Sequence, residues 1–156
     1  MKNVFGDLWT YPADWHCVPT NGDTRRDGYA VMGRGCAREA AQYWPAAQKR
    51  LGLLLELRGN RVHDLGLWFK HGRYFRLFSF PAKHHWRGIA DLQLIERSCE
   101  ELHAKWATVP NDKPTVVIPR PGCGNGGLLW AEVEPILQRL LTEPEFCKKT
   151  KSEGRA

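Results

Sequence analysis

Residues 119–130 form a glycine-rich segment with the sequence Pro-Arg-Pro-Gly-Cys-Gly-Asn-Gly-Gly-Leu-Leu-Trp. The β-branched run Thr115–Ile118 comes before it and predicts a buried strand. Apolar residues at helical spacing follow it, from Trp130 to Leu140, and predict a helix. A glycine-rich turn between a buried strand and a helix lets backbone N–H groups come close to an anion. The segment therefore predicts a phosphate-binding loop.

A second segment has the same order of elements. The apolar run 15–20 predicts a buried strand, and a polar loop that contains Thr24–Tyr29 follows it. Gly33 and Gly35 then precede an alanine-rich helix predicted over Cys36–Trp44. One such loop often reflects turn geometry alone, but two in a short chain favour a cradle for a diphosphate. Neither loop matches G-x-G-x-x-G or G-x-x-x-x-G-K-[ST], which excludes dinucleotide dehydrogenases and P-loop nucleotide hydrolases.

Basic residues crowd the end of a third predicted strand, which stops at Pro81. In open α/β sheets, ligands bind beyond the carboxyl ends of the strands. Lys83 at this end can clamp a phosphate or act as an amine nucleophile, although a solvated surface lysine is the commonest alternative. The neighbouring His84 and His85 could suggest a metal site. Adjacent side chains rarely point the same way, so a surface or pocket-rim role is favoured over metal binding. We expect neither a metal nor a cofactor.

The remaining pattern alternates strands and helices, which predicts a layered α/β fold. Two strands are predicted over Leu65–Phe69 and Tyr74–Phe80, and an apolar stripe predicts a helix over Ile89–Ala107. We expect one domain over residues 1–143. Residues 144–156 are basic and predict a disordered tail.

Composition and charge limit the class of protein. The chain has 156 residues, 42% of them hydrophobic and 26% charged, which is ordinary for a globular domain. Its formal net charge of +6 favours anionic partners, nucleic acid among them. The five cysteines contain no C-x-x-C pair, so a reducing, cytoplasmic location is expected. The apolar runs are too short to span a bilayer, and we expect a monomer without a membrane partner.

Four segments resemble the macro-domain family. Residues 6–8 resemble its opening G-D-[IL], and residues 31–37 resemble its M-G-[KR]-G-x-A phosphate loop. Residues 119–130 are similar to the P-x-x-G-C-G-x-G-G-L-x-W loop of the branch that holds the terminal ADP-ribose glycohydrolases and the DarG-type antitoxins. Residues 80–87 resemble the DarG-type F-P-T-K-x-H-W-R segment. The resemblance implies a three-layer α/β/α macro-domain fold with a mixed central sheet.

The resemblance also implies roles for individual residues. Asp7 would bind the adenine amine, and Asn21 would face the distal ribose. Gly33–Cys36 would wrap one side of the diphosphate and Gly122–Gly127 the other. Lys83 would attack or polarise C1 of the distal ribose. The implied ligand-binding residues are Asp7, Leu8, Thr20, Asn21, Met32, Gly33, Arg34, Gly35, Cys36, Pro119, Gly122, Cys123, Gly124, Asn125, Gly126 and Gly127.

The chain departs from the family pattern in two places. The loop 21–32 is longer than in the DarG-type pattern and contains Arg25-Arg26-Asp27, which can cover the pocket or contact a substrate. Gly126 stands near the position where eukaryotic relatives carry an aspartate that works with the lysine. Asn125 or Asp27 are the residues expected to take its place.

The resemblance implies an ADP-ribosyl hydrolase that removes ADP-ribose from modified nucleic acid, as DarG does, or from protein. Two alternatives use the same pocket: a module that binds ADP-ribose or a related signalling nucleotide without turnover, and an ADP-ribose-1''-phosphate phosphatase. A basic nucleic-acid-binding protein with no nucleotide pocket is a further alternative, and the paired glycine loops argue against it.

Overall fold

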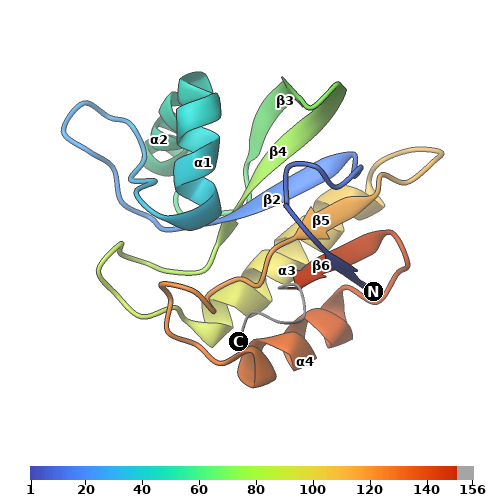
Figure 1. Ribbon diagram of the computed structural model, residues 1–156. Helices are drawn as coiled ribbons and strands as arrows, with labels where there is room; N and C mark the ends of the chain where they lie inside the picture. The colour runs from blue at the N-terminus through green and yellow to red at the C-terminus, as the bar shows by residue number, and fades with distance from the viewer. Residues whose placement is uncertain (151–156) are drawn as a thin grey trace.

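The computed structural model describes residues 1–150, which form a six-stranded mixed sheet between two pairs of helices (Figure 1). The strand order is β1-β6-β5-β2-β4-β3, and every neighbouring pair is parallel except β3 and β4. The strands are β1 (Lys2–Phe5), β2 (Trp15–Thr20), β3 (Asp64–Lys70), β4 (Arg73–Pro81), β5 (Val116–Ile118) and β6 (Phe146–Thr150). The helices are α1 (Gly35–Tyr43), α2 (Pro45–Arg58), α3 (Leu92–Ala107) and α4 (Trp130–Leu140).

Alternate residues of the central strands divide between two cores, one on each face of the sheet. Leu77 of β4 packs on the face covered by α1 and α2, whereas the next residue, Phe78, packs on the face covered by α3 and α4. Val18 and Cys17 of β2 divide in the same way. Period-two alternation with both faces buried is what a largely parallel sheet under two helical layers requires. The predicted three-layer α/β/α architecture is confirmed.

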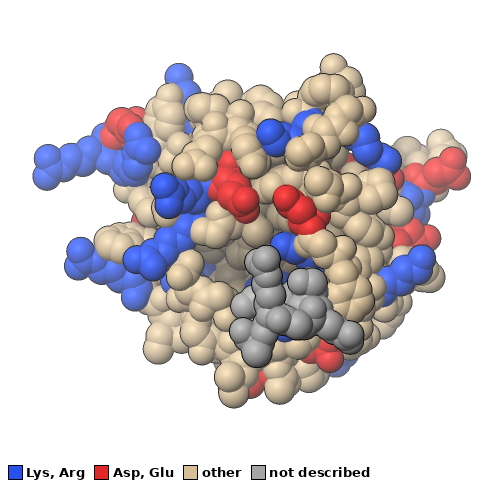
Figure 2. All heavy atoms as spheres, viewed as in Figure 1, with Lys and Arg blue, Asp and Glu red and all other residues tan. Residues whose placement is uncertain are grey.

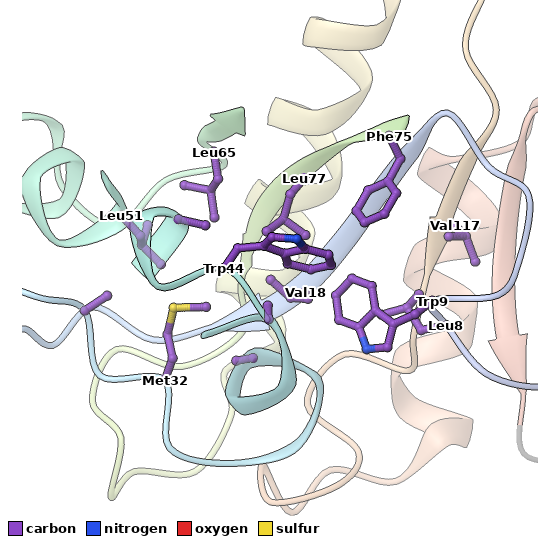
Figure 3. Close-up of a cluster of buried hydrophobic side chains, with 14 of the residues drawn as sticks. Leu8, Trp9, Val18, Met32, Trp44, Leu51, Leu65, Phe75, Leu77 and Val117 are labelled. Carbon is purple, nitrogen blue, oxygen red and sulfur yellow. The ribbon is translucent and has the colours of Figure 1, made fainter. Parts of the chain in front are cut away.

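Aromatic rings fill the core under α1 (Figure 3). The Trp9 ring lies 5.2 Å from the Trp44 ring and 6.1 Å from the Phe75 ring, centroid to centroid. It also stacks on His16 at 6.0 Å. Burial lowers the pKa of His16 to about 4, so this imidazole is neutral in the core at physiological pH. Three of the seven tryptophans, Trp9, Trp44 and Trp68, therefore pack on this side of the sheet.

The prediction of a disordered tail after residue 143 was wrong for residues 146–150. This segment is β6, a parallel strand inserted between β1 and β5. Phe146 and Cys147 are buried, and the ammonium group of Lys148 is buried against Glu134 at 2.5 Å. The sequence alone does not distinguish a buried, paired lysine from a solvated one. The basic run therefore resembled a tail. The rest of the predicted tail, residues 151–156, lies outside the described residues.

Two further elements were not predicted. β1 lies at the sheet edge, and its residues are exposed or half-buried. α2 begins at Pro45, which is tolerated there because the first N–H groups of a helix have no partner within it. Its leucines lie on both sides, since Leu51 is buried whereas Leu57 is 70% exposed, so no single apolar stripe marks the helix. No helix within residues 1–150 is long and apolar enough to cross a membrane.

Candidate ligand-binding site

A cavity of about 450 Å³ opens at the carboxyl ends of the central parallel strands. β2 ends at Thr20, β4 at Pro81 and β5 at Ile118, and the segments after all three enclose the cavity. Ligands of α/β proteins bind at this edge of the sheet. The predicted residues that line the cavity are Thr20, Asn21, Met32, Gly33, Arg34, Gly35, Cys36, Lys83, Pro119, Gly122, Gly124, Asn125 and Gly126.

The predicted and observed sets of lining residues differ in both directions. The predicted residues that do not line the cavity are Asp7, Leu8, Cys123 and Gly127, and the lining residues that sequence reasoning missed are Pro19, Val31, Ala37, Ala82, Trp86 and Arg120. Trp86 and Arg120 are the important additions, because both have polar or aromatic groups that can contact a ligand. Each residue follows the end of a predicted strand. Whether its side chain points toward the cavity depends on the conformation of the loop, which the sequence pattern does not give.

The loop before α1 forms one wall of the cavity. Gly35 has a φ of +59°, a left-handed conformation that a side chain would strain. Added Cβ atoms at Gly33 and Gly35 would meet nothing within 4 Å, so the backbone here borders open space. The first N–H groups of α1 have no acceptor inside the helix and suit an anion. Burial raises the pKa of the Cys36 thiol to about 11, so it stays neutral in this wall.

The loop after β5 forms the opposite wall and is folded tightly on itself. Leu128 N–H donates to the Gly122 carbonyl at 2.9 Å, and Ala90 N–H donates to the Gly126 carbonyl at 2.9 Å. A Cβ at Gly126 would lie 2.7 Å from the Gly122 Cα and 2.8 Å from the Ala90 Cβ. An aspartate therefore cannot replace Gly126 without moving this loop. Gly124, by contrast, borders open space.

Two buried polar groups in the cavity wall lack hydrogen-bond partners among residues 1–150. They are the hydroxyl of Thr20, which is 6% exposed, and Nε of Arg120. Both residues line the cavity, but these two atoms themselves have almost no exposed surface, so they are unsatisfied polar groups within its wall. The guanidinium of Arg120 lies over the Trp130 ring, 4.9 Å from its centroid, and this contact holds it at the wall.

Comparisons with solved structures agree with this fold, although no protein-family model matches the sequence. The macrodomain of Mycobacterium tuberculosis DarG is 22% identical and superposes with a TM-score of 0.75 over 97% of both chains. The macrodomain of Thermus aquaticus DarG is 25% identical, with a TM-score of 0.70 over 97% of both chains. Thermosipho africanus DarTG in complex with ADP-ribose has a TM-score of 0.75 and 20% identity, over 99% of this chain and 43% of that one.

Two curated relatives are at least 30% identical to the chain. A DNA ADP-ribosyl transferase–DNA ADP-ribosyl glycohydrolase fusion protein of Thermosipho africanus is 30% identical over 127 residues, which are 77% of this chain. The DNA ADP-ribosyl glycohydrolase of Thermus aquaticus is 32% identical over 122 residues, or 71% of this chain. The chain belongs to the DarG-type macrodomains. It spans about 30% of the length of these curated relatives.

In this DarG-type macrodomain, Lys83 lies on a loop whose backbone is held by several hydrogen bonds. Its N–H donates to the Thr20 carbonyl at 3.3 Å, and its carbonyl accepts from the Asn60 side chain at 2.9 Å. The next carbonyl, of His84, accepts from Gly22 N–H at 3.0 Å. The Lys83 side chain is half-buried in the cavity wall, and its Nζ lies 3.4 Å from the Trp86 carbonyl. No acidic side chain within residues 1–150 forms an ion pair with it.

The two histidines after Lys83 are held by different carboxylates, so they diverge. His84 Nε2 lies 2.8 Å from Asp91, which also caps α3, and His85 Nδ1 lies 3.1 Å from Asp23. The hydrogen bond to His84 outweighs the opposing effect of burial and keeps the pKa of Asp91 below its usual range. Residues 1–150 contain no group of three or more His, Cys, Asp or Glu side chains arranged to hold a metal.

Asn21 lines the cavity, and its side chain also forms hydrogen bonds within the loop 21–32 of this DarG-type macrodomain. Its amide nitrogen donates to the Val31 carbonyl at 3.0 Å, and its oxygen accepts from Asp23 N–H at 2.9 Å. Asp27 lies at the outer end of that loop, where it pairs with Arg25, and it does not line the cavity. The expectation that Asp27 replaces the missing aspartate was therefore wrong, whereas Asn125 does line the cavity.

Asp7 and Leu8 lie beside the cavity and not in it. The Asp7 carboxylate accepts from Trp9 N–H at 2.9 Å and is exposed, whereas Leu8 is a core residue. The charge of Asp7 still contributes to the raised pKa of the Cys36 thiol, and Lys149 of β6 opposes it. Asp7 therefore stands near the cavity's α1 side, where its predicted contact with adenine stays a prediction.

Proposed function

We propose that this macrodomain binds ADP-ribose in the cavity and removes it from a modified macromolecule, with Lys83 as the catalytic residue. The observation that carries the proposal is the position of the Lys83 amine, which lies in the cavity wall between two glycine-rich loops and has no acidic partner among residues 1–150. The names of the curated relatives, which include a DNA ADP-ribosyl glycohydrolase, support the same reaction.

The binding step uses backbone groups. The N–H groups at the start of α1 and those of the loop Gly122–Gly126 hold the diphosphate from two sides. Thr20 and Arg120 also line the cavity and add polar side chains to its wall. Binding energy from the diphosphate then fixes the distal ribose beside Lys83, which lowers the entropic cost of reaction.

The chemical step exchanges one bond at C1 of the distal ribose for another. The unprotonated amine of Lys83 attacks C1, and the bond from C1 to the acceptor breaks. A proton from the new ammonium neutralises the departing acceptor. Water then cleaves the bond between Lys83 and the sugar, so that free ADP-ribose leaves and the amine is restored. In this scheme the aspartate of eukaryotic relatives is absent, and Asn125 is the polar side chain from the same loop that lines the cavity.

Nucleic acid is the acceptor that the charge of the chain favours. The formal net charge is +6, and basic side chains gather over the loops Thr24–Tyr29 and 83–88 on the left of Figure 2. Such a surface attracts a polyanion and makes its binding salt-dependent.

The experiment that tests the proposal compares three substrates: an ADP-ribosylated oligonucleotide, an ADP-ribosylated protein and ADP-ribose-1''-phosphate. We expect release of ADP-ribose from the oligonucleotide, measured by chromatography. Phosphate release from the third substrate alone would indicate a phosphatase. Tight binding of ADP-ribose with no change in any substrate would indicate a binding module.

A further inference from the structure

Trp86 is exposed although it belongs to the wall of the cavity. Its exposed fraction is 48%, whereas the other six tryptophans of the chain are buried or half-buried. Tryptophan is normally well buried, because its large apolar surface is costly to leave in water. An exposed indole at the mouth of a ligand cavity therefore indicates a surface that a further part of the ligand covers.

The backbone of the loop that carries Trp86 is held by hydrogen bonds. Trp86 N–H donates to the Asp23 carboxylate at 2.8 Å, and the Trp86 carbonyl lies 3.4 Å from Lys83 Nζ. Gly88 N–H closes the turn on the His85 carbonyl at 3.0 Å. The indole is therefore exposed on a loop whose backbone is held by hydrogen bonds, and the backbone carbonyl of Trp86 lies beside the amine of Lys83.

A basic group accompanies the indole. The guanidinium carbon of Arg87 lies 4.6 Å from the centroid of the Trp86 ring. Arg87 is exposed, and neither it nor Arg34, which lines the cavity just before α1, forms an ion pair within residues 1–150. An indole and an unpaired guanidinium together match a flat aromatic ring that is joined to a phosphate, which is the chemistry of a nucleotide. A modified carboxylate or hydroxyl of a protein offers no such ring.

We propose that Trp86 is the stacking surface for the nucleobase that bears ADP-ribose, and that Arg87 contacts the phosphate next to this base. The inference rests on the proposed function and names the residue that selects its acceptor. A base in a duplex has both faces covered, so the acceptor must be single-stranded or turned out of the helix. Stacking on an aromatic side chain contributes enough affinity to distinguish a nucleobase from a protein side chain.

The test uses Trp86→Ala and Trp86→Phe in a Lys83→Ala background, so that substrate binds without being consumed. Fluorescence anisotropy gives the affinity for a labelled, ADP-ribosylated single-stranded oligonucleotide, and calorimetry gives the affinity for free ADP-ribose. We expect Trp86→Ala to weaken binding of the oligonucleotide about 10-fold, while the affinity for ADP-ribose stays within about twofold. Trp86→Phe, which keeps a ring, should recover most of the loss.

Tyr74→Ala is the matched control, since Tyr74 is an aromatic residue with 66% exposure that does not line the cavity. It should change neither affinity. Unchanged oligonucleotide binding by Trp86→Ala would overturn the proposal, and so would an equal loss for the oligonucleotide and for ADP-ribose, because the indole would then contact ADP-ribose itself. Because binding is measured without turnover, this outcome is separate from a failure of the proposed catalysis.

Discussion

The carboxylate of Asp23 accepts a hydrogen bond from the backbone N–H of Trp86 at 2.8 Å. These residues lie 63 positions apart, one in the long loop after β2 and the other in the loop that carries Lys83. The same carboxylate contacts His85 Nδ1 at 3.1 Å. Asp23 thus joins the loop that is longer than the family pattern to the loop that carries the proposed catalytic amine, so it is a positioning residue.

Asp23→Ala should reduce kcat for ADP-ribose release more than it changes KM, because Lys83 loses its fixed position while the diphosphate loops remain. Asp23→Asn, whose side-chain oxygen can still accept from Trp86 N–H, should recover much of kcat. Steady-state kinetics on an ADP-ribosylated oligonucleotide measure both constants. Equal kcat for wild type and Asp23→Ala would show that this contact does not position Lys83.

The same contact predicts a pH dependence of stability. Burial alone would raise the pKa of Asp23, but the hydrogen bonds from Trp86 and His85 lower it below the ordinary value of 3.8. A lowered pKa means that the carboxylate stabilises the fold above the unfolded-state pKa and that this contribution is lost as pH falls through the folded-state pKa. Urea denaturation should therefore separate wild type and Asp23→Asn by about 1 kcal/mol at pH 7 and by less at pH 3. A constant difference at both pH values would contradict the assignment.

Gly126 and Gly124 give a matched pair for the loop after β5. Gly126→Ala should weaken ADP-ribose binding at least about 10-fold, because the new Cβ would lie 2.7 Å from the Gly122 Cα and force the loop to move. Gly124→Ala should be tolerated, since nothing lies within 4 Å of an added Cβ there. Calorimetry measures both affinities, and equal behaviour of the two variants would contradict the loop geometry.

Gly124→Glu should abolish binding by placing a negative charge beside the diphosphate.

A substitution at Phe146 tests whether β6 is part of the folded core. Its side chain is fully buried, so Phe146→Ala should lower the free energy of unfolding by about 3–5 kcal/mol. Phe5 is 59% exposed on β1, and Phe5→Ala should change the free energy of unfolding by less than about 1 kcal/mol. Denaturation curves in urea compare the two. A neutral Phe146→Ala would mean that this segment is not part of the core.

The predictable part of the fold is the part where local chemistry and burial agree. β2 was predicted with its observed bounds, Trp15–Thr20, because an apolar run ends at turn residues. α4 was predicted from the spacing of its buried residues. β6 was missed because Lys148 is buried by pairing with Glu134, a tertiary contact that no local pattern contains. α3 begins at Leu92, later than predicted, because the Asp91 side chain caps it.

The candidate site divides in a similar way. The two glycine loops were predictable, since glycine is required where φ is positive, as at Gly35, or where the backbone packs closely on another segment, as at Gly126. The contribution of Trp86 was not, because its orientation depends on the distant Asp23. Leu8 differs from these residues, since its side chain packs in the core and its predicted ligand contact stays a prediction.

The central claim concerns the amine of Lys83, and release of ADP-ribose from a modified oligonucleotide by Lys83 variants tests it most directly. We predict that Lys83→Ala and Lys83→Arg both lower the single-turnover rate at least about 100-fold while ADP-ribose still binds, since arginine keeps the charge but is not a nucleophile. Release at the wild-type rate by Lys83→Ala, or full activity of Lys83→Arg, would contradict the account.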